Sequence, residues 1–262
     1  MSTHSQRNRN ALFALAFAAL SSLLWSLRTP SGDSALAAPR IDSGAENSQP
    51  FLIQKVAPSD IRYVAVGDSY TCGTGATPRQ SWPALLTRHL RAHGIPIGLA
   101  ANLGVAGWTT RQALEVETPV FRKQSPTFAT LMIGVNDTYR ATTAEEFRIQ
   151  LAALIDQMQS ALPDKSKILL VTIPDFTVTR SGAEYARQSE AASKIIAFNA
   201  IIQDEAARRG LPVVDVYPLS QQMANAPDLT ASDGLHPSAK EYALWERLIL
   251  PAASKMLRDK AH

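Results

Sequence analysis

The sequence predicts an α/β fold in which helices cover both faces of a parallel sheet. Five short apolar runs alternate with longer amphipathic stretches from residue 60 onward, the pattern of repeated strand–helix units. The run at residues 128–133 is almost wholly apolar, as expected of a strand buried on both faces. Polar or glycine-rich turns follow four of the five runs. In a parallel sheet such turns meet at one edge, where ligands bind.

The elements follow in order along the chain. The predicted strands are residues 61–66, 95–101, 128–133, 168–173 and 211–216. The predicted helices are one from Ser81 to Gly94, one over residues 110–117, one begun by the capping box of Thr143 and Glu146, one from about Ala183 to Gly210, and one begun by the capping box of Ser238 and Glu241. Pro251 should kink or end the last helix.

The first 38 residues have the pattern of a secretory signal peptide. Arg7 and Arg9 precede an apolar stretch at residues 11–27, and Ala35-Leu36-Ala37 offers a small-residue cleavage site. The apolar stretch is nearly as long as the shortest membrane-spanning helices, so an uncleaved anchor is the alternative. We therefore expect an exported protein, periplasmic or extracellular, that contacts a membrane only through this segment if it is retained.

Residues 39–59 are predicted to be a linker and residues 60–262 one domain. The linker is rich in Pro, Ser, Gly and Asn apart from Phe51-Leu52-Ile53. From Ala38 onward the chain has 23 basic and 22 acidic residues, a net charge of +1 out of the whole chain's +3. Without a basic patch we expect no nucleic-acid partner. Cys72 is the only cysteine, so the chain cannot form an internal disulfide.

Ser69 is the first candidate for chemistry, because it follows the first predicted strand within Gly67-Asp68-Ser69. A serine at the carboxyl edge of a parallel sheet can act as a nucleophile if a nearby base removes its proton. The same three residues also suit an ordinary turn, since glycine allows unusual φ angles and Asp and Ser bond their own backbone. Ser69 alone leaves both interpretations open.

His236 is the histidine best placed to serve as that base. His4 lies in the predicted signal peptide and His262 is the last residue. His89 and His93 lie near the end of the first helix, away from Ser69, where packing explains them better than a metal site. Asp233 precedes His236 by three residues in a loop before the last helix. That spacing lets a carboxylate hold Nδ1 of the imidazole and leave Nε2 free, although the same residues also suit a turn.

Acyl transfer also requires donors for an oxyanion, and two turns offer them. Gly107 follows the second predicted strand and lets a backbone N–H approach a substrate closely, while Asn136 follows the third and offers an amide. Either turn could also be an ordinary strand–helix connection. Four such turns at one edge of one sheet make a catalytic site the better interpretation.

These four blocks resemble those of the SGNH, or GDSL-type, hydrolases: GDSYT with Ser69, NLGVAGWT with Gly107, GVND with Asn136, and DGLH with Asp233 and His236. The resemblance covers residues 61–257. It implies a flavodoxin-like five-stranded parallel sheet of order 2-1-3-4-5 in a three-layer α/β/α sandwich.

The resemblance also implies the roles of these residues in an esterase or lipase. Ser69 would be the nucleophile, and His236 the general base and then general acid, oriented by Asp233. The N–H groups of Ser69 and Gly107 and the side-chain amide of Asn136 would form the oxyanion hole. Gly107 is preferred to Gly104 for its distance from Asn102 and the Thr109 that follows.

The expected substrate is an acylated sugar or a short-chain or lipid ester, with no cofactor and no metal, and we expect a monomer. Tyr70, Trp108 and Tyr139 flank the blocks and are candidate substrate-binding residues, with packing as the alternative. An O-acyltransferase would use the same residues. A flavin-binding module would explain the Gly/Thr-rich stretch at residues 71–77 but not Asp233, His236 or Asn136. Cys72 is interpreted as a small core residue and not as a nucleophile.

Overall fold

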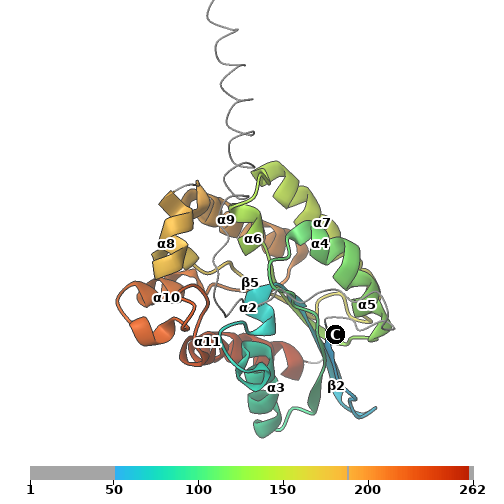
Figure 1. The fold of residues 1–262 in the computed structure, drawn as a ribbon. Coiled ribbons are helices and arrows are strands. Elements are labelled where there is room, and N and C mark those ends of the chain that lie inside the picture. The colour runs from blue at the N-terminus through green and yellow to red at the C-terminus, as the bar shows by residue number, and fades with distance from the viewer. Residues whose placement is uncertain (1–50, 188, 260–262) are drawn as a thin grey trace, which may run out of the picture. The chain divides into compact units, whose positions relative to one another are not determined.

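A six-stranded sheet forms the centre of the computed structural model, which describes residues 51–187 and 189–259 (Figure 1). Its strands lie in the order β1-β3-β2-β4-β5-β6. The strands are β1 (Leu52–Ile53), β2 (Ile61–Gly67), β3 (Ile97–Asn102), β4 (Phe128–Met132), β5 (Ile168–Val171) and β6 (Val213–Val214). The predicted signal peptide and residues 39–50 of the predicted linker lie outside the described residues.

Five of the strands, β3-β2-β4-β5-β6, are parallel neighbours in the predicted 2-1-3-4-5 order, so the predicted fold is confirmed. The sixth strand, β1, was not predicted. It pairs antiparallel with β3, with Leu52 opposite Asn102, inside the range predicted to be a linker. The last two residues of the apolar triplet that begins at Phe51 are thus part of the sheet, because β3 offers them a free edge.

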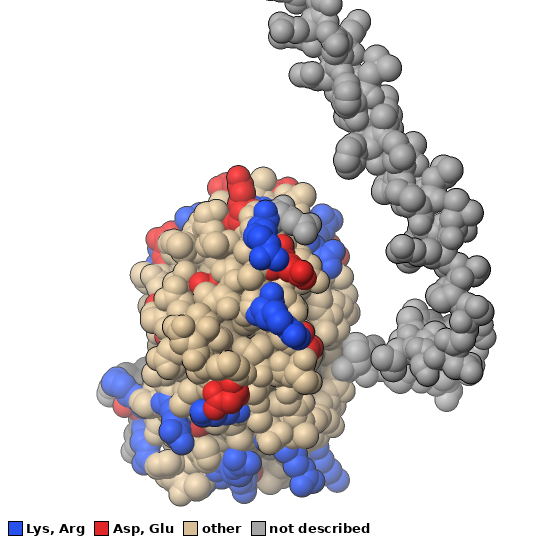
Figure 2. Space-filling view, turned by 60° about the vertical axis from the view of Figure 1, so that its left-hand side comes forward, with Lys and Arg blue, Asp and Glu red and all other residues tan. Residues whose placement is uncertain are grey.

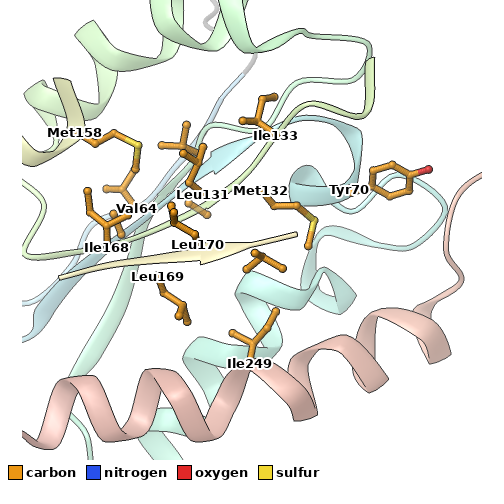
Figure 3. Close-up of a cluster of buried hydrophobic side chains, with 14 of the residues drawn as sticks. Val64, Tyr70, Leu131, Met132, Ile133, Met158, Ile168, Leu169, Leu170 and Ile249 are labelled. Atoms are coloured by element: carbon orange, nitrogen blue, oxygen red, sulfur yellow. The ribbon is translucent and has the colours of Figure 1, made fainter. Parts of the chain in front are cut away.

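Helices cover both faces of this sheet (Figure 1). On one side lie α3 (Trp82–Ala92) and α11 (Ala239–Arg258), which pack against each other. On the other side lie α5 (Thr118–Lys123), α7 (Ala144–Ala161) and α9 (Ala191–Arg209). Figure 3 shows the core between these layers, with Met158 of α7 on one side of β5 and Ile249 of α11 on the other. Every residue of β4 and β5 is buried, as their apolar sequences require.

Shorter helical segments connect the layers at the carboxyl ends of the strands. They are α2 (Ser69–Cys72), η1 (Pro78–Gln80), α4 (Thr110–Gln112), η2 (Ala113–Glu117), α6 (Val135–Thr138), η3 (Phe176–Val178), α8 (Arg180–Arg187), α10 (Tyr217–Ser220), η4 (Gln221–Ala224) and η5 (Pro227–Leu229). The predicted helix 110–117 therefore continues through a π-type turn, η2, into α5.

The helix prediction for residues 183–210 was wrong in detail, and of the two outcomes expected at Pro251, a kink or an end, the end does not occur. The helix expected from about Ala183 to Gly210 is divided into α8 and α9, and Ser189 lies at the break with its hydroxyl donating to the carbonyl of Tyr185. Such side-chain bonds compete with the helical ladder. Pro251 does not end α11, which continues to Arg258. Ile249 and Ala253, on either side of Pro251, are both buried, so packing holds the helix through the missing hydrogen bond.

The capping predictions differ in outcome at the two sites. Thr143 and Glu146 form the complete capping box: Thr143 Oγ1 accepts from Glu146 N at 3.1 Å, and Glu146 Oε2 accepts from Thr143 N at 2.8 Å. Ser238 Oγ accepts from Glu241 N at 3.4 Å, but the Glu241 carboxylate turns inward and accepts from Trp245 Nε1 at 2.6 Å. Only half of the second capping box therefore forms.

The surface in Figure 2 has Lys and Arg side chains with Asp and Glu near several of them, and much of this face has no charged side chain. Among residues 51–187 and 189–259, none of the helices has the length and apolarity needed to span a bilayer.

We predict that Glu241→Gln makes folding stability less dependent on pH. Burial raises the pKa of Glu241 to about 7, and the hydrogen bond from Trp245 only partly opposes this. Because the folded carboxyl binds its proton more tightly than the unfolded one, wild-type stability falls as pH rises from about 4.3 to about 7. At pH 8 the glutamine variant should be more stable, by on the order of 2 kcal/mol.

Thermal unfolding between pH 4.5 and pH 8 measures this difference. Glu145→Gln, at an exposed position on α7, is the control and should follow the wild-type curve. A Glu241→Gln variant whose Tm keeps the full wild-type pH dependence would contradict the prediction.

Candidate active site

A cavity of about 180 Å³ lies at the carboxyl edge of the sheet, where the four predicted turns meet. Its lining comes from α2, from the segment after β3, from α6, from η3 and α8, and from the loop before α11. The lining residues are Ser69, Tyr70, Ala106, Gly107, Val135, Asn136, Tyr139, Phe176, Tyr185, Leu235 and His236. Four of the predicted site residues, Ser69, Gly107, Asn136 and His236, thus face one space.

Ser69 is the first residue of α2, directly after β2. Asp68 caps this short helix, and its Oδ1 accepts from Tyr70 N at 3.0 Å. The N–H of a first helical residue has no partner within the helix, so the N–H of Ser69 is available to a ligand. The turn is tight: Thr71 Oγ1 donates to the carbonyl of Met132 on β4 at 3.3 Å, and a Cβ at Gly67 would collide with both groups. The sequence Gly-Asp-Ser therefore fits this turn and presents the serine to the cavity.

His236 and Asp233 form a hydrogen-bonded pair. Asp233 Oδ2 lies 2.7 Å from His236 Nδ1, and Oδ1 accepts from the N–H groups of Leu235 and His236 at 2.9 and 3.0 Å. Partial burial acts to raise the pKa of Asp233, but these hydrogen bonds outweigh it and the pKa lies below the usual value. An ionised Asp233 accepts a hydrogen bond from Nδ1–H of His236, which keeps the proton on Nδ1 and leaves Nε2 free. The ring of Tyr70 packs against the imidazole with centroids 5.6 Å apart.

The two glycines after β3 have different surroundings. A Cβ at Gly104 would lie 2.6 Å from Cys72 N and 2.7 Å from the carbonyl oxygen of Asp68, so this glycine packs against the back of the serine turn. Gly107 has φ +82°, and a Cβ there would meet no atom within 4 Å. The cavity is lined by Gly107 and not by Gly104.

Asn136 lies on α6, which begins directly after Gly134. Its Nδ2 donates to the carbonyl of Trp108 at 2.7 Å and lies 3.5 Å from Asp68 Oδ2, while its Oδ1 accepts from the Tyr139 hydroxyl. The amide therefore contacts the turns after β2 and β3 as well as its own helix. A primary amide with one N–H near the limit of hydrogen bonding can donate that hydrogen to a ligand.

Two of the three candidate substrate-binding aromatics, Tyr70 and Tyr139, line the cavity. Trp108 does not, which differs from the expectation. Its ring packs edge-on against Phe51, with centroids 6.0 Å apart and planes at 84°. Only the backbone carbonyl of Trp108 contributes to the site, because Phe51, just before β1, supplies an apolar partner that the linker prediction did not anticipate.

Sequence reasoning missed two aromatic residues of the cavity, Phe176 and Tyr185. Tyr139 contacts both: its ring centroid lies 6.0 Å from that of Phe176 and 5.8 Å from that of Tyr185, on which it stacks. Phe176 follows β5, the one parallel strand whose turn was not considered. Its position at the carboxyl edge of the sheet could have identified it as a candidate cavity residue.

Three buried carboxyl groups surround the serine turn and were also missed. Glu117 Oε2 accepts from Gly67 N at 3.0 Å, and Asp137 Oδ2 accepts from Thr110 N at 2.9 Å. Burial raises the pKa of Asp68 to about 7, with a further increase from the nearby charge of Asp137 and an opposing effect of the hydrogen bond from Tyr70 N. Burial likewise raises the pKa of Glu117 and of Asp137. These groups have no cationic partner among the described ion pairs.

The residues behind three other interpretations, a thiol nucleophile, a histidine metal site and a flavin site, have the following contacts. Burial raises the pKa of the Cys72 thiol, whose Sγ donates to the carbonyl of Ser69 at 3.3 Å. His89 pairs with the buried Glu246 at 2.9 Å. Within the described ranges no group of three or more His, Cys, Asp or Glu is arranged to hold a metal ion. In the Gly/Thr-rich stretch, a Cβ at Gly75 would lie 2.6 Å from the carbonyl of Pro237, so this stretch packs against the loop before α11.

Residues 65–244 match the model of the GDSL-like lipase/acylhydrolase family. The chain belongs to this family. It is accordingly a carboxylic ester hydrolase, as the four sequence blocks indicated.

Solved structures agree with this assignment. The lipase/acylhydrolase from Enterococcus faecalis is 26% identical, with a TM-score of 0.62 over 77% of this chain and 99% of that one. Two others share the fold: the psychrotrophic esterase EstA from Pseudoalteromonas sp. (21% identity, TM-score 0.59, 76% of this chain and 100% of that one) and a family 3 carbohydrate esterase from Clostridium thermocellum (21%, 0.60, 76% and 98%). A search of curated proteins found no match.

We predict that Gly107→Ala lowers esterase activity far more than it lowers stability. Gly94 is a matched control, because it has a similar φ of +78° and equally open surroundings at the end of α3. Each substitution should reduce stability by about 1 kcal/mol through backbone strain. Only Gly107→Ala alters a backbone group that faces the cavity, so it alone should lower kcat/KM, by about tenfold or more.

Thermal unfolding and ester hydrolysis of both variants provide the test. Equal activity of the two variants would mean that the backbone at Gly107 takes no part in the reaction.

Proposed function

We propose that this esterase hydrolyses small acyl esters through a Ser69–His236–Asp233 triad and a covalent acyl-enzyme. The observation that supports the proposal is the shared cavity: Ser69 and His236 both line it, and Asp233 Oδ2 lies 2.7 Å from His236 Nδ1. The pair defines the tautomer in which Nε2 accepts a proton.

In the first step Ser69 Oγ attacks the ester carbonyl carbon while His236 Nε2 takes the hydroxyl proton. The carbonyl π electrons move to oxygen, and the tetrahedral oxyanion forms. When the C–O bond to the alcohol breaks, His236 returns the proton to the leaving oxygen. A water molecule then repeats the sequence on the acyl-enzyme, releasing the acid and Ser69. The His236 side chain is 17% exposed, which allows water to reach it.

The proposed oxyanion hole comprises the N–H groups of Ser69 and Gly107 and the Nδ2 of Asn136. All three residues line the cavity from different turns. The position of Ser69 at the start of α2 and the open surroundings of Gly107 support the two backbone donors. Donors held in place before reaction are effective because they need not reorganise as the charge develops.

The cavity also supports a preference for short acyl groups. Its volume of about 180 Å³ lies below the roughly 300–1,000 Å³ of typical small-molecule sites. One wall is aromatic, formed by Tyr139, Phe176 and Tyr185, and the remaining lining side chains include Val135 and Leu235. The described lining contains no Lys, Arg, Asp or Glu, so we propose an uncharged acyl group.

The catalytic proposal predicts that an organophosphonate ester modifies Ser69 and that Ser69→Ala abolishes hydrolysis. Asn136→Ala should lower kcat by roughly 100- to 1,000-fold and change KM little, because the oxyanion exists only in the transition state. Asn225→Ala, at an exposed asparagine, is the control. Mass spectrometry that finds the adduct on another residue would overturn the assignment of Ser69. A raised KM with unchanged kcat in Asn136→Ala would remove Asn136 from the oxyanion hole.

The acyl-group proposal predicts that kcat/KM for p-nitrophenyl esters is highest for acetyl or butyryl and falls at least about tenfold for octanoyl, a loss of about 1.4 kcal/mol. Phe176→Ala enlarges the cavity and should shift the preference to longer chains. Adding methanol to the assay separates hydrolysis from transfer, since an acyltransferase would form methyl ester in place of free acid. Preference for octanoyl in the wild-type enzyme would contradict the proposal.

A further inference from the structure

The side chain of Tyr139 makes a contact that its position in the cavity does not explain. Tyr139 ends α6, three residues after Asn136, and its hydroxyl donates to Asn136 Oδ1. Asn136 itself is only 3% exposed. Tyr139 lies at the cavity wall, but its hydroxyl thus bonds to a side chain that we assign to the oxyanion hole.

The orientation of the Asn136 amide follows from the chemistry of its neighbours. The carbonyl of Trp108 can only accept, so the NH₂ group must face it, at 2.7 Å. Oδ1 then faces the hydroxyl of Tyr139, which can donate to it. The second Nδ2 hydrogen has only Asp68 Oδ2 at 3.5 Å, a distance at which a hydrogen bond is weak. That hydrogen is the one available to a substrate oxyanion.

We propose that Tyr139 is a positioning residue: its hydroxyl holds Asn136 Oδ1 so that the second Nδ2 hydrogen points at the oxyanion. This inference rests on the proposed function, because it gives Asn136 the role of oxyanion donor. It assigns to Tyr139 a role other than substrate contact.

The surroundings of Tyr139 suit such a role. Its ring packs against Phe176 on η3 and Tyr185 on α8, which together restrict the position of the hydroxyl. Burial raises the pKa of Tyr139, and the nearby carboxyl of Asp68 raises it further. The hydroxyl therefore keeps its proton and remains a donor throughout the working range of an esterase. Phe176 and Tyr185 thus help to orient the Asn136 amide, because they restrict the position of Tyr139.

The test compares Tyr139→Phe with Tyr217→Phe. Both variants keep an aromatic ring and lose one hydroxyl that forms a hydrogen bond, but only Tyr139 lines the cavity and contacts Asn136. Tyr139→Phe should lower kcat about tenfold with KM nearly unchanged, the order expected for one hydrogen bond in a buried site. It should weaken binding of a trifluoromethyl ketone, which forms a tetrahedral adduct with serine, by a similar factor. Tyr217→Phe should change neither quantity by more than about twofold.

A double-mutant cycle separates this inference from the function on which it rests. If Tyr139 acts through Asn136, the Asn136→Ala/Tyr139→Phe variant should have the kcat of Asn136→Ala alone. The positioning role would be overturned if Tyr139→Phe keeps wild-type kcat or changes KM only. It would also be overturned if Tyr139→Phe lowers kcat a full tenfold in the Asn136→Ala background. Neither result would remove Asn136 from the oxyanion hole. If Asn136→Ala itself retains wild-type kcat, the proposed oxyanion hole fails, and the inference fails with it. The Tm of each variant shows whether its fold is retained.

Discussion

The site depends on the close approach of the backbone at the carboxyl end of β2. Gly67 lies so near β4 that it has no room for a side chain, and Gly104 fits against the back of the same turn. The turn is bonded from separate elements: Glu117 accepts from Gly67 N, and Val105 N donates to Gly67 O at 3.3 Å. These contacts set where β2 stops and α2 begins, and so where Ser69 lies. Displacement of any one would move the serine relative to His236.

The buried carboxyl groups around this turn lower the folding stability, and their hydrogen bonds fix the geometry of the turn. Asp68 caps α2 and lies near the Asn136 amide, Glu117 binds Gly67, and Asp137 binds Thr110. Each accepts backbone or amide hydrogens, which makes its position specific, yet burial raises the pKa of all three. Charged groups in a poorly solvated site destabilise the fold near and above neutral pH. Active sites commonly combine precise geometry with such local instability.

Chemistry and substrate selection are assigned to different parts of the chain in our proposal. The serine, the histidine pair and the oxyanion donors come from the turns after β2, β3 and β4 and the loop before α11. The aromatic wall comes largely from η3 and α8, through Phe176 and Tyr185. Tyr139 belongs to both groups, since it stacks on the wall and bonds to Asn136. Changes in η3 or α8 can therefore alter the acyl preference while the reacting groups stay in place.

The sequence by itself determined the order of the parallel strands, through its resemblance to the GDSL-type hydrolases, and the meeting of Ser69, Gly107, Asn136 and His236, with Asp233 beside His236. Topology explains the first three, because turns that follow parallel strands lie at one edge of the sheet. Asp233 and His236 lie well beyond β6, in the loop before α11, and the resemblance of the DGLH block indicated their place. Tertiary structure decided which partners the neighbouring side chains contact. Whether Trp108 faces the substrate or Phe51, and whether Glu241 caps α11 or bonds Trp245, depends on packing partners that local sequence patterns do not specify. Packing between distant segments also decided that β1 joins the sheet and that Phe176 and Tyr185 form a wall of the cavity. The same packing places the Tyr139 hydroxyl on Asn136.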